Sequence, residues 1–200
     1  MSGRKKRTGP SIYILDSCAY FRLARHIRPL LGLKFGPPPH YKLFVLKRMK
    51  MELLKNPRLK SKFHWISETE FQKEILSGTY IPRGKKKEAA EYAKSFLNEH
   101  VKETHINAQK AGPSPADIEA LAVAFAIPGI VVSDDKNLRE TGILFSIETI
   151  DSVDLLEKLL SDHVIDTEAL QSLADYWSYD KDLPMNRRKL NKKINDLLKK

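Results

Sequence analysis

Apolar residues follow two different spacings along this chain, and the two spacings alternate. Continuous apolar runs at 11–15 (SIYIL) and 130–133 (IVVS) predict strands buried on both faces, as in a parallel sheet. ILFSIETI at 143–150 predicts a third strand, and FHWIS at 63–67 predicts a short one. Helical spacing predicts helices at 19–35, 41–56, 67–78, 85–103, 115–126 and 153–162, with further helix over 163–200. Strands that alternate with helices predict an α/β fold with a mostly parallel sheet.

Capping residues mark the start of two of these helices. Ser67 and Glu70 form an S-x-x-E pattern that predicts a capping box, and Gly78 is expected to end that helix. Ser114 is expected at the N-cap of a later helix, with Pro115 at its first position and Asp117 at its third.

Changes in composition divide the chain into three parts. Residues 1–10 are a basic arm that ends in Gly-Pro, and residues 11–160 hold the alternating strands and helices. Residues 161–200 form a helical extension that becomes increasingly basic. An apolar stripe on its last helix predicts that the extension docks on the rest of the protein, through Leu190, Ile194 and Leu197.

The charge balance narrows the choice of partners. The 200 residues carry a formal net charge of +10, which favours a polyanionic partner such as nucleic acid over the alternative of a soluble protein with solvated surface lysines. Cys18 is the only cysteine, which excludes an internal disulfide framework and a zinc site built on several thiolates. The longest apolar region is too short to span a bilayer, and no signal peptide is evident, so we expect a cytoplasmic protein without a membrane partner.

Carboxylates follow the two most apolar strands directly. Asp16 ends the first strand, and Asp134 and Asp135 end the later one. If these strands are parallel neighbours, their acids meet at one edge of the sheet, where open α/β folds bind ligands. Asp117 begins the helix that precedes the second strand. That helix must run antiparallel to the strand, so Asp117 is expected near Asp135.

Each acid also has a purely structural explanation, as a helix cap for Asp16 and Asp117 and as a polar turn for Asp134 and Asp135. The functional hypothesis depends on their combination. Convergent carboxylates repel one another unless a cation lies among them, and hard oxygen ligands select Mg²⁺ or Mn²⁺. Such a cation in a basic protein indicates a nuclease, because lysines and arginines attract the phosphate backbone that the metal site acts on.

The segments ILDSCAYF (14–21), SPADIEALAVAFA (114–126) and IVVSDDKNLRE (130–140) together resemble a PIN domain. This is the metal-dependent ribonuclease fold of VapC-type toxins and of RNA-processing nucleases. The resemblance spans about residues 11–160 and implies a three-layer α/β/α sandwich. It also implies that Mg²⁺ or Mn²⁺ is the cofactor and RNA the substrate. The toxin interpretation further implies an antitoxin partner and a homodimer.

Carried over residue by residue, the resemblance assigns metal binding to Asp16, Asp117 and Asp135, with Asp134 ranked behind Asp135. PIN domains also place a glutamate on a helix after the second strand. Among the glutamates of SETEFQKEIL, we choose Glu74, because it lies one turn beyond Phe71 on the expected buried face. The chain departs from the pattern at Cys18, where Ser or Asn is common, and at Asn137, where a further acid is common.

The leading hypothesis is therefore a Mg²⁺- or Mn²⁺-dependent endoribonuclease, whether a toxin or an RNA-processing enzyme. Its catalytic, metal-binding residues would be Asp16, Glu74, Asp117 and Asp135. The alternative is an RNA-binding or regulatory PIN-like module whose acid site is degenerate. A phosphatase on a similar fold is disfavoured, because the chain lacks a Gly-rich phosphate loop.

Overall fold

The computed structural model describes residues 11–32, 34–38, 40–106 and 112–199. The basic arm expected at residues 1–10 lies outside this part of the chain. No helix in the described ranges is long and apolar enough to cross a membrane.

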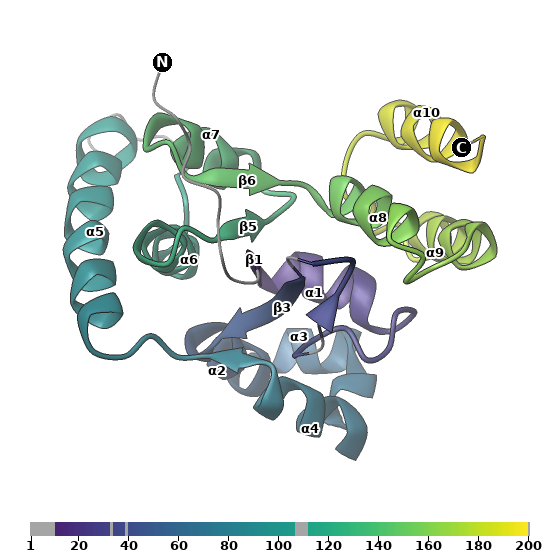
Figure 1. Ribbon diagram of the computed structural model, residues 1–200, viewed down its shortest axis with the longest axis horizontal. Helices are drawn as coiled ribbons and strands as arrows, with labels where there is room; N and C mark the ends of the chain where they lie inside the picture. The colour runs from purple at the N-terminus through teal and green to yellow at the C-terminus, as the bar shows by residue number, and fades with distance from the viewer. Residues whose placement is uncertain (1–10, 33, 39, 107–111, 200) are drawn as a thin grey trace.

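A mixed, mostly parallel sheet lies at the centre of the molecule (Figure 1). Its strands run in the order β2 (Lys34–Phe35), β3 (Tyr41–Leu46), β1 (Ser11–Leu15), β5 (Ile130–Val132) and β6 (Glu148–Ile150), and β4 (Thr79–Tyr80) also pairs with β3. Among the described strands, only the short β2 is antiparallel to its neighbour. Ile14 of β1 pairs with Phe44 on one side and Val131 on the other, so the two most apolar strands are parallel neighbours, as predicted.

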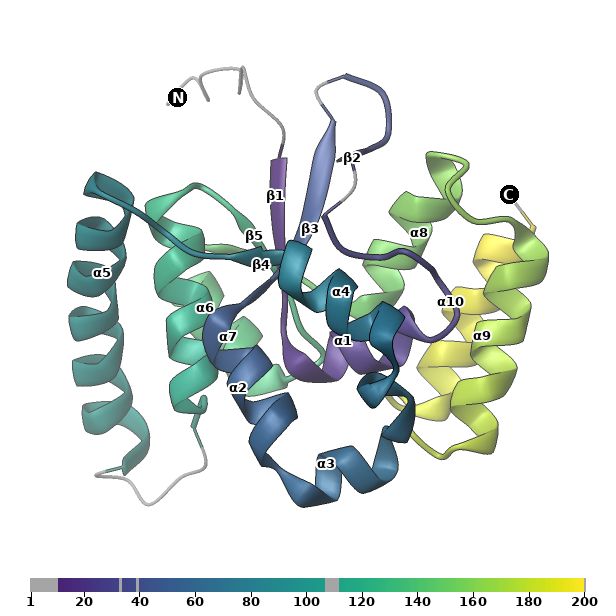
Figure 2. The same ribbon diagram turned by 90° about the horizontal axis from the view of Figure 1, so that it is seen from below.

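Helices cover both faces of this sheet (Figure 2). One face carries α5 (Lys85–Val101), α6 (Pro115–Ala126) and α7 (Lys136–Leu144), with the π-helical turn η2 (Lys102–Ile106) at the end of α5. The other carries α1 (Ser17–Ala24), α8 (Ser152–Ser161), α9 (Thr167–Tyr179) and α10 (Arg187–Leu198). Beyond the sheet lie α2 (Lys47–Lys55), α3 (Pro57–Lys62), the 3₁₀ helix η1 (His64–Ser67) and α4 (Thr69–Ser77). The predicted α/β class with a mostly parallel sheet is confirmed.

The prediction of one helix over 41–56 is wrong in its first half. Tyr41, Leu43 and Val45 are buried, whereas Lys42 and Phe44 between them are partly exposed. This alternation has the period of two that is typical of a strand, and it forms β3. The helical spacing begins only at α2.

Three other expected elements differ from the structure. FHWIS (63–67) forms the 3₁₀ helix η1 rather than a strand, and the strand expected over 143–150 is confined to β6, because α7 extends to Leu144. The helix expected over 19–35 ends at Ala24; farther along, Arg28 precedes Pro29, a position that disfavours helix.

The two predicted caps had different outcomes. The capping box expected at Ser67 is not formed, since Glu68 is the N-cap of α4 and makes no side-chain cap, although Gly78 does end this helix. The capping box between Ser114 and Asp117 is formed, with Pro115 as the first residue of α6.

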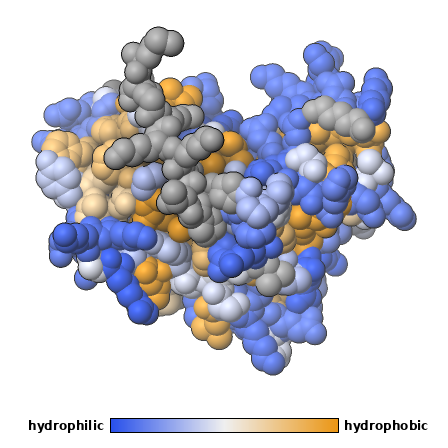
Figure 3. All heavy atoms as spheres, viewed as in Figure 1, coloured by the Kyte–Doolittle hydropathy of each residue, from blue (hydrophilic) through white to orange (hydrophobic). Residues whose placement is uncertain are grey.

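The C-terminal extension docks as its apolar stripe predicts. Its buried side chains belong to the same hydrophobic core as the sheet: Leu170, Leu173, Trp177, Leu190, Ile194 and Leu197. Trp177 Nε1 donates to the Arg22 carbonyl at 3.1 Å, which ties α9 to α1. Figure 3 shows that the outer surface of this part, at the upper right of the view, is mostly hydrophilic.

Candidate acidic metal site

Four carboxylates line one pocket of about 200 Å³ at the ends of β1 and β5. They are Asp16, Glu52, Asp117 and Asp135, and the pocket is completed by Ser17, Cys18, Met49, Ser114, Ala116 and Ala120. We call this the acid pocket. It brings together three of the predicted site residues, adds Glu52, and contains neither Asp134 nor Glu74.

Asp16 is the most buried of the four acids. It follows β1, and as the N-cap of α1 its Oδ1 accepts from the Ala19 N–H at 2.6 Å. Its Oδ2 accepts from the Ser133 hydroxyl, and the residue is only 8% exposed. Burial raises the pKa of Asp16 to about 7, although the hydrogen bonds from Ser133 and Ala19 lower it, and the charges of Asp134 and Asp117 raise it further.

Asp117 both caps a helix and lines the acid pocket. Its Oδ2 accepts from the Ser114 N–H at 2.7 Å, and its own N–H donates to Ser114 Oγ at 3.2 Å, so it does complete a capping box. The same carboxylate lines the acid pocket. Burial raises its pKa against the effect of these hydrogen bonds, and the charge of Asp135 adds to the increase.

Asp135 is positioned through Ser133. Its Oδ1 accepts from the Leu138 N–H at 2.8 Å and so caps α7, while its own N–H donates to Ser133 Oγ at 3.1 Å. Because the Ser133 hydroxyl also donates to Asp16, one fully buried side chain joins two acids of the pocket. Ser133 is a positioning residue that sequence reasoning treated only as part of a motif.

Asp134 serves a different purpose from its neighbour. Its Oδ2 forms an ion pair with Arg22 Nη1 at 2.6 Å and accepts from Ser152 Oγ at 2.8 Å, and its Oδ1 accepts from the Ser152 N–H at 2.9 Å. Arg22 also pairs with Asp182, in the loop between α9 and α10. Burial raises the pKa of Asp134 despite these partners, so they offset only part of its desolvation cost. Asp134 therefore links β5 to α1, α8 and the extension.

The structure also places Glu74 away from the acid pocket. It is buried, as its position beside Phe71 predicts, and only 7% exposed. Its Oε1 accepts from the Leu30 and Leu31 N–H groups, both at 3.0 Å, so it anchors the segment that leads into β2. Burial raises its pKa, and the two backbone hydrogen bonds lower it in part.

Glu52 lies where the resemblance would also place the glutamate that the sequence analysis assigned to Glu74. The resemblance places a glutamate on the helix after the second strand, and the second long strand is β3. The helix after β3 is α2, and Glu52 is its only acid. It lies one turn from the buried Met49, which also lines the pocket. The signal was present in the sequence but was hidden when residues 41–56 were interpreted as one helix.

The pKa of Glu52 is raised by burial, and the charges of Asp117 and Glu119 add to this, while Arg48 and a hydrogen bond with Ser17 lower it. Arg48 Nε lies 4.0 Å from Glu52 Oε1, and both side chains are exposed enough for solvent to weaken this contact. Glu52 therefore shares the electrostatic environment of the other pocket acids.

Comparison with known proteins assigns no family. The chain matches no protein-family model, and no curated protein shows significant similarity to it. The resemblance to PIN domains, with the toxin, antitoxin and homodimer that it implies, therefore stays a prediction.

The acid pocket supplies the donor chemistry that a hard divalent cation requires. Among the described residues, no group of three or more His, Cys, Asp or Glu side chains is already arranged as a metal cluster. Carboxylates of four separate segments nevertheless face one space, and the pKa values of Asp16, Glu52 and Asp117 are all raised. A cation among them would relieve this cost, and oxygen donors favour Mg²⁺ or Mn²⁺.

Proposed function

We propose that the protein is a metal-dependent endoribonuclease with a PIN-like, three-layer α/β/α fold. Mg²⁺ or Mn²⁺ would be held by Asp16, Glu52, Asp117 and Asp135, with Glu52 in place of the predicted Glu74. The observation that carries this proposal is the acid pocket, where four carboxylates from separate segments converge. Its place at the carboxyl ends of β1 and β5 is where parallel sheets bind ligands.

The chain's own groups support this chemistry in two ways. Caps on α1, α6 and α7 fix the backbone at Asp16, Asp117 and Asp135, so the carboxyl groups are held together before any ligand binds. The net charge of +10 favours approach of a phosphate backbone to a pocket that would otherwise repel it. The bound cation would activate water and stabilise negative charge on the phosphoryl oxygens.

A second candidate is an RNA-binding module without nuclease activity. The observation in its favour is that the described acids do not form a ready-made metal cluster. Asn137, where the resemblance expects a further acid, lies on α7 and is not part of the pocket lining. Such a module would bind RNA and leave it intact, with or without Mn²⁺.

The test is RNA cleavage by the purified protein with Mn²⁺ or Mg²⁺, with and without a chelator, beside the Asp16→Asn variant prepared in the same way. Asparagine keeps an oxygen that can accept from the Ala19 N–H, so the cap on α1 survives. We expect chelation to stop cleavage, and the variant to be slower by about 10²- to 10³-fold, as when one electrostatic group is removed from a catalytic site. Cleavage by Asp16→Asn at the wild-type rate would exclude the proposal.

A further inference from the structure

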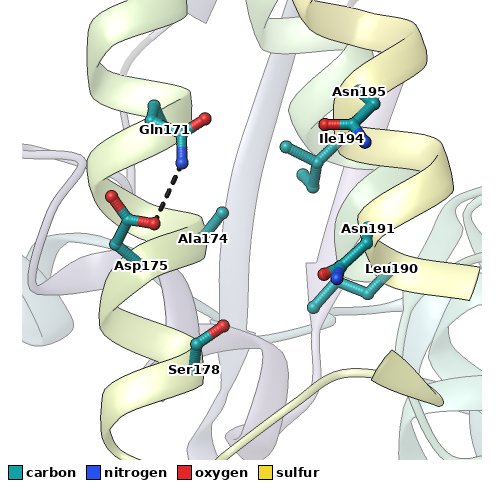
Figure 4. Close-up of a pocket in the computed structure, with 8 residues that line it drawn as sticks. All are labelled: Gln171, Ala174, Asp175, Ser178, Leu190, Asn191, Ile194 and Asn195. Atoms are coloured by element: carbon teal, nitrogen blue, oxygen red, sulfur yellow. Dashed lines mark hydrogen bonds between the residues drawn. The ribbon is translucent and has the colours of Figure 1, made fainter. Parts of the chain in front are cut away.

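The C-terminal extension contains a second pocket, of about 290 Å³, between α9 and α10. Four residues of α9 and four of α10 line it, and Figure 4 draws them as sticks: Gln171, Ala174, Asp175, Ser178, Leu190, Asn191, Ile194 and Asn195. We call this the hairpin groove. In Figures 1 and 2, α9 and α10 lie on the side of the molecule opposite α5.

The lining of the hairpin groove is rich in hydrogen-bonding groups that carry no charge. Gln171 Nε2 donates to Asp175 Oδ1 at 2.9 Å. The side-chain oxygen of Gln171 points toward α10 in Figure 4, where it can accept a hydrogen bond from a ligand. The side chains of Asn191 and Asn195 form no hydrogen bond with any other described residue, and both are exposed. Carboxamides offer a donor and an acceptor side by side, which matches the edge of a nucleobase.

Cations border this groove on the α10 side. On a helix, residues three and four positions apart are neighbours. Arg187 and Arg188 therefore lie beside Asn191, and Lys192 and Lys199 lie beside Asn195. All four are exposed, and none forms an ion pair within the described part of the chain.

Lys193 shows what a structural cation on this helix looks like. It is only partly exposed and pairs with Asp151 Oδ2 at 3.1 Å and Asp154 Oδ1 at 2.8 Å, so it fastens α10 to α8. The neighbouring cations have no such role. They form no ion pair with any described acid, and the nearest acid at helical spacing is the exposed Asp196, beside Lys192 and Lys199.

An aromatic side chain borders the α9 side. Tyr179 is 89% exposed, and it lies four positions after Asp175, so the two are neighbours on the helix surface. A tyrosine this exposed gains little from packing within its own chain. Its ring is free to stack against a planar ligand.

We infer that the hairpin groove binds single-stranded RNA at a distance from the acid pocket. An unstacked base would enter the groove, its edge hydrogen-bonding the carboxamides and Asp175, with Tyr179 stacking on a base and the α10 cations contacting phosphates. An acidic peptide would satisfy the cations but offers no flat ring to Tyr179 and no base edge to the asparagines. The identity of the ligand as RNA rests on the proposed function, whereas the groove and its chemistry do not.

Binding of a labelled single-stranded RNA to the full chain tests this inference, with a chelator present so that nothing is cut. The variant Arg188→Gln/Lys192→Gln is compared with Lys85→Gln/Lys86→Gln, which removes the same charge from exposed positions at the start of α5. We expect the logarithmic salt dependence of binding to fall by about 1.4 for the α10 variant, since each single-strand phosphate contact contributes about 0.7, and to change far less for the control. Tyr179→Ala should weaken binding about tenfold.

Equal losses from the α10 variant and the control would mean that RNA senses only net charge, and would overturn the inference. So would wild-type affinity in both the α10 variant and Tyr179→Ala, or displacement of the RNA by poly-glutamate as readily as by unlabelled RNA. The outcome is separable from that of the proposed function. A protein that cuts RNA while these variants bind normally refutes only the hairpin groove, and one that loses binding in them but never cuts RNA refutes only the nuclease.

Discussion

The acid pocket and the buried site of Glu74 both contain carboxylates whose pKa is raised by burial, yet they are built for different purposes. The carboxylate of Glu74 stabilises a loop, because its Oε1 accepts hydrogen bonds from the Leu30 and Leu31 N–H groups. Its Oε2 is buried without a hydrogen-bond partner among the described residues. In the acid pocket, several carboxylates share a space that remains open to a ligand.

The difference shows that burial of an acid does not by itself indicate function. A raised pKa shows that burial destabilises the charged form of the carboxylate. A single buried carboxylate can nevertheless be retained because its hydrogen bonds hold a loop in place. Function is indicated when acids of separate segments also share a space that a ligand can enter, as Asp16, Asp117 and Asp135 do in the acid pocket. The charge of Asp134 raises the pKa of Asp16 as well, but Asp134 belongs with Glu74, because it does not line the pocket and because Arg22 and Ser152 already occupy its oxygens.

Replacing Glu52 or Glu74 with glutamine tests this difference most directly. We expect Glu52→Gln to slow RNA cleavage by about 10²-fold, because it removes charge from the pocket. Glu74→Gln keeps the Oε1 acceptor for Leu30 and Leu31 and leaves the acid pocket unchanged, so its cleavage rate should stay within about twofold of wild type, about 0.4 kcal/mol in activation free energy. Initial rates with saturating Mn²⁺ distinguish them. Loss of activity in Glu74→Gln alone would reverse the two assignments.

Asp134 provides a second test of this difference. It is next to Asp135 in the sequence, but it pairs with Arg22 and Ser152 and does not line the acid pocket. Asp134→Ala leaves Arg22 with only Asp182 as an ion-pair partner and removes the acceptor of the Ser152 N–H. We expect the free energy of unfolding to fall by about 3 kcal/mol, as when one partner of a buried pair is removed. Chemical denaturation measures this change. Asp134→Asn, which keeps an acceptor for Ser152, is the control and should lose less.

A smaller effect concerns the pH dependence of the metal-free protein. Because the pKa of Asp16 is about 7 in the folded state, above its ordinary value of 3.8, the folded state retains a proton that the unfolded chain loses. This contribution to stability is complete below pH 3.8 and is lost as the pH rises through 7. We expect the free energy of unfolding to fall by about 1 kcal/mol between pH 6 and pH 8.

Two controls belong to that experiment. Asp16→Asn has no proton to lose and should show a flatter pH profile than the wild type over the same range. Saturating Mn²⁺ should also flatten the wild-type profile, because the cation takes over the role of the proton. A profile that is the same in the variant and the wild type would contradict the assignment of the titration to Asp16.

The strands at the centre of the fold were predictable, because burial on both faces leaves a run of apolar residues that no other element explains. The N-cap of α6 was predictable for a similar reason, since Ser114, Pro115 and Asp117 each suit one position only. β3 was not recognised, because Lys42 and the following basic residues also fit a helical spacing. Only the neighbouring strands decide between the two, through pairs such as Phe44 with Ile14.

The candidate site was predictable where it follows from strand order and not where it depends on side-chain partners. Asp16, Asp117 and Asp135 converge because β1 and β5 are parallel neighbours. Nothing local to the sequence shows that Asp134 faces Arg22, more than a hundred positions away. Glu52 was missed for the same reason as β3. Because residues 41–46 were not recognised as a strand, the helix that carries Glu52 was not recognised as the helix that follows a strand.

The central claim is that the acid pocket binds a divalent cation. A crystal grown with Mn²⁺, measured at a wavelength where manganese scatters anomalously, tests it directly. The account predicts an anomalous peak within coordination distance of oxygens from Asp16, Glu52, Asp117 and Asp135, and a weaker peak or none in Asp16→Asn crystals. Ordered carboxylates with no peak between them at saturating Mn²⁺, or a peak at Glu74 instead, would contradict it.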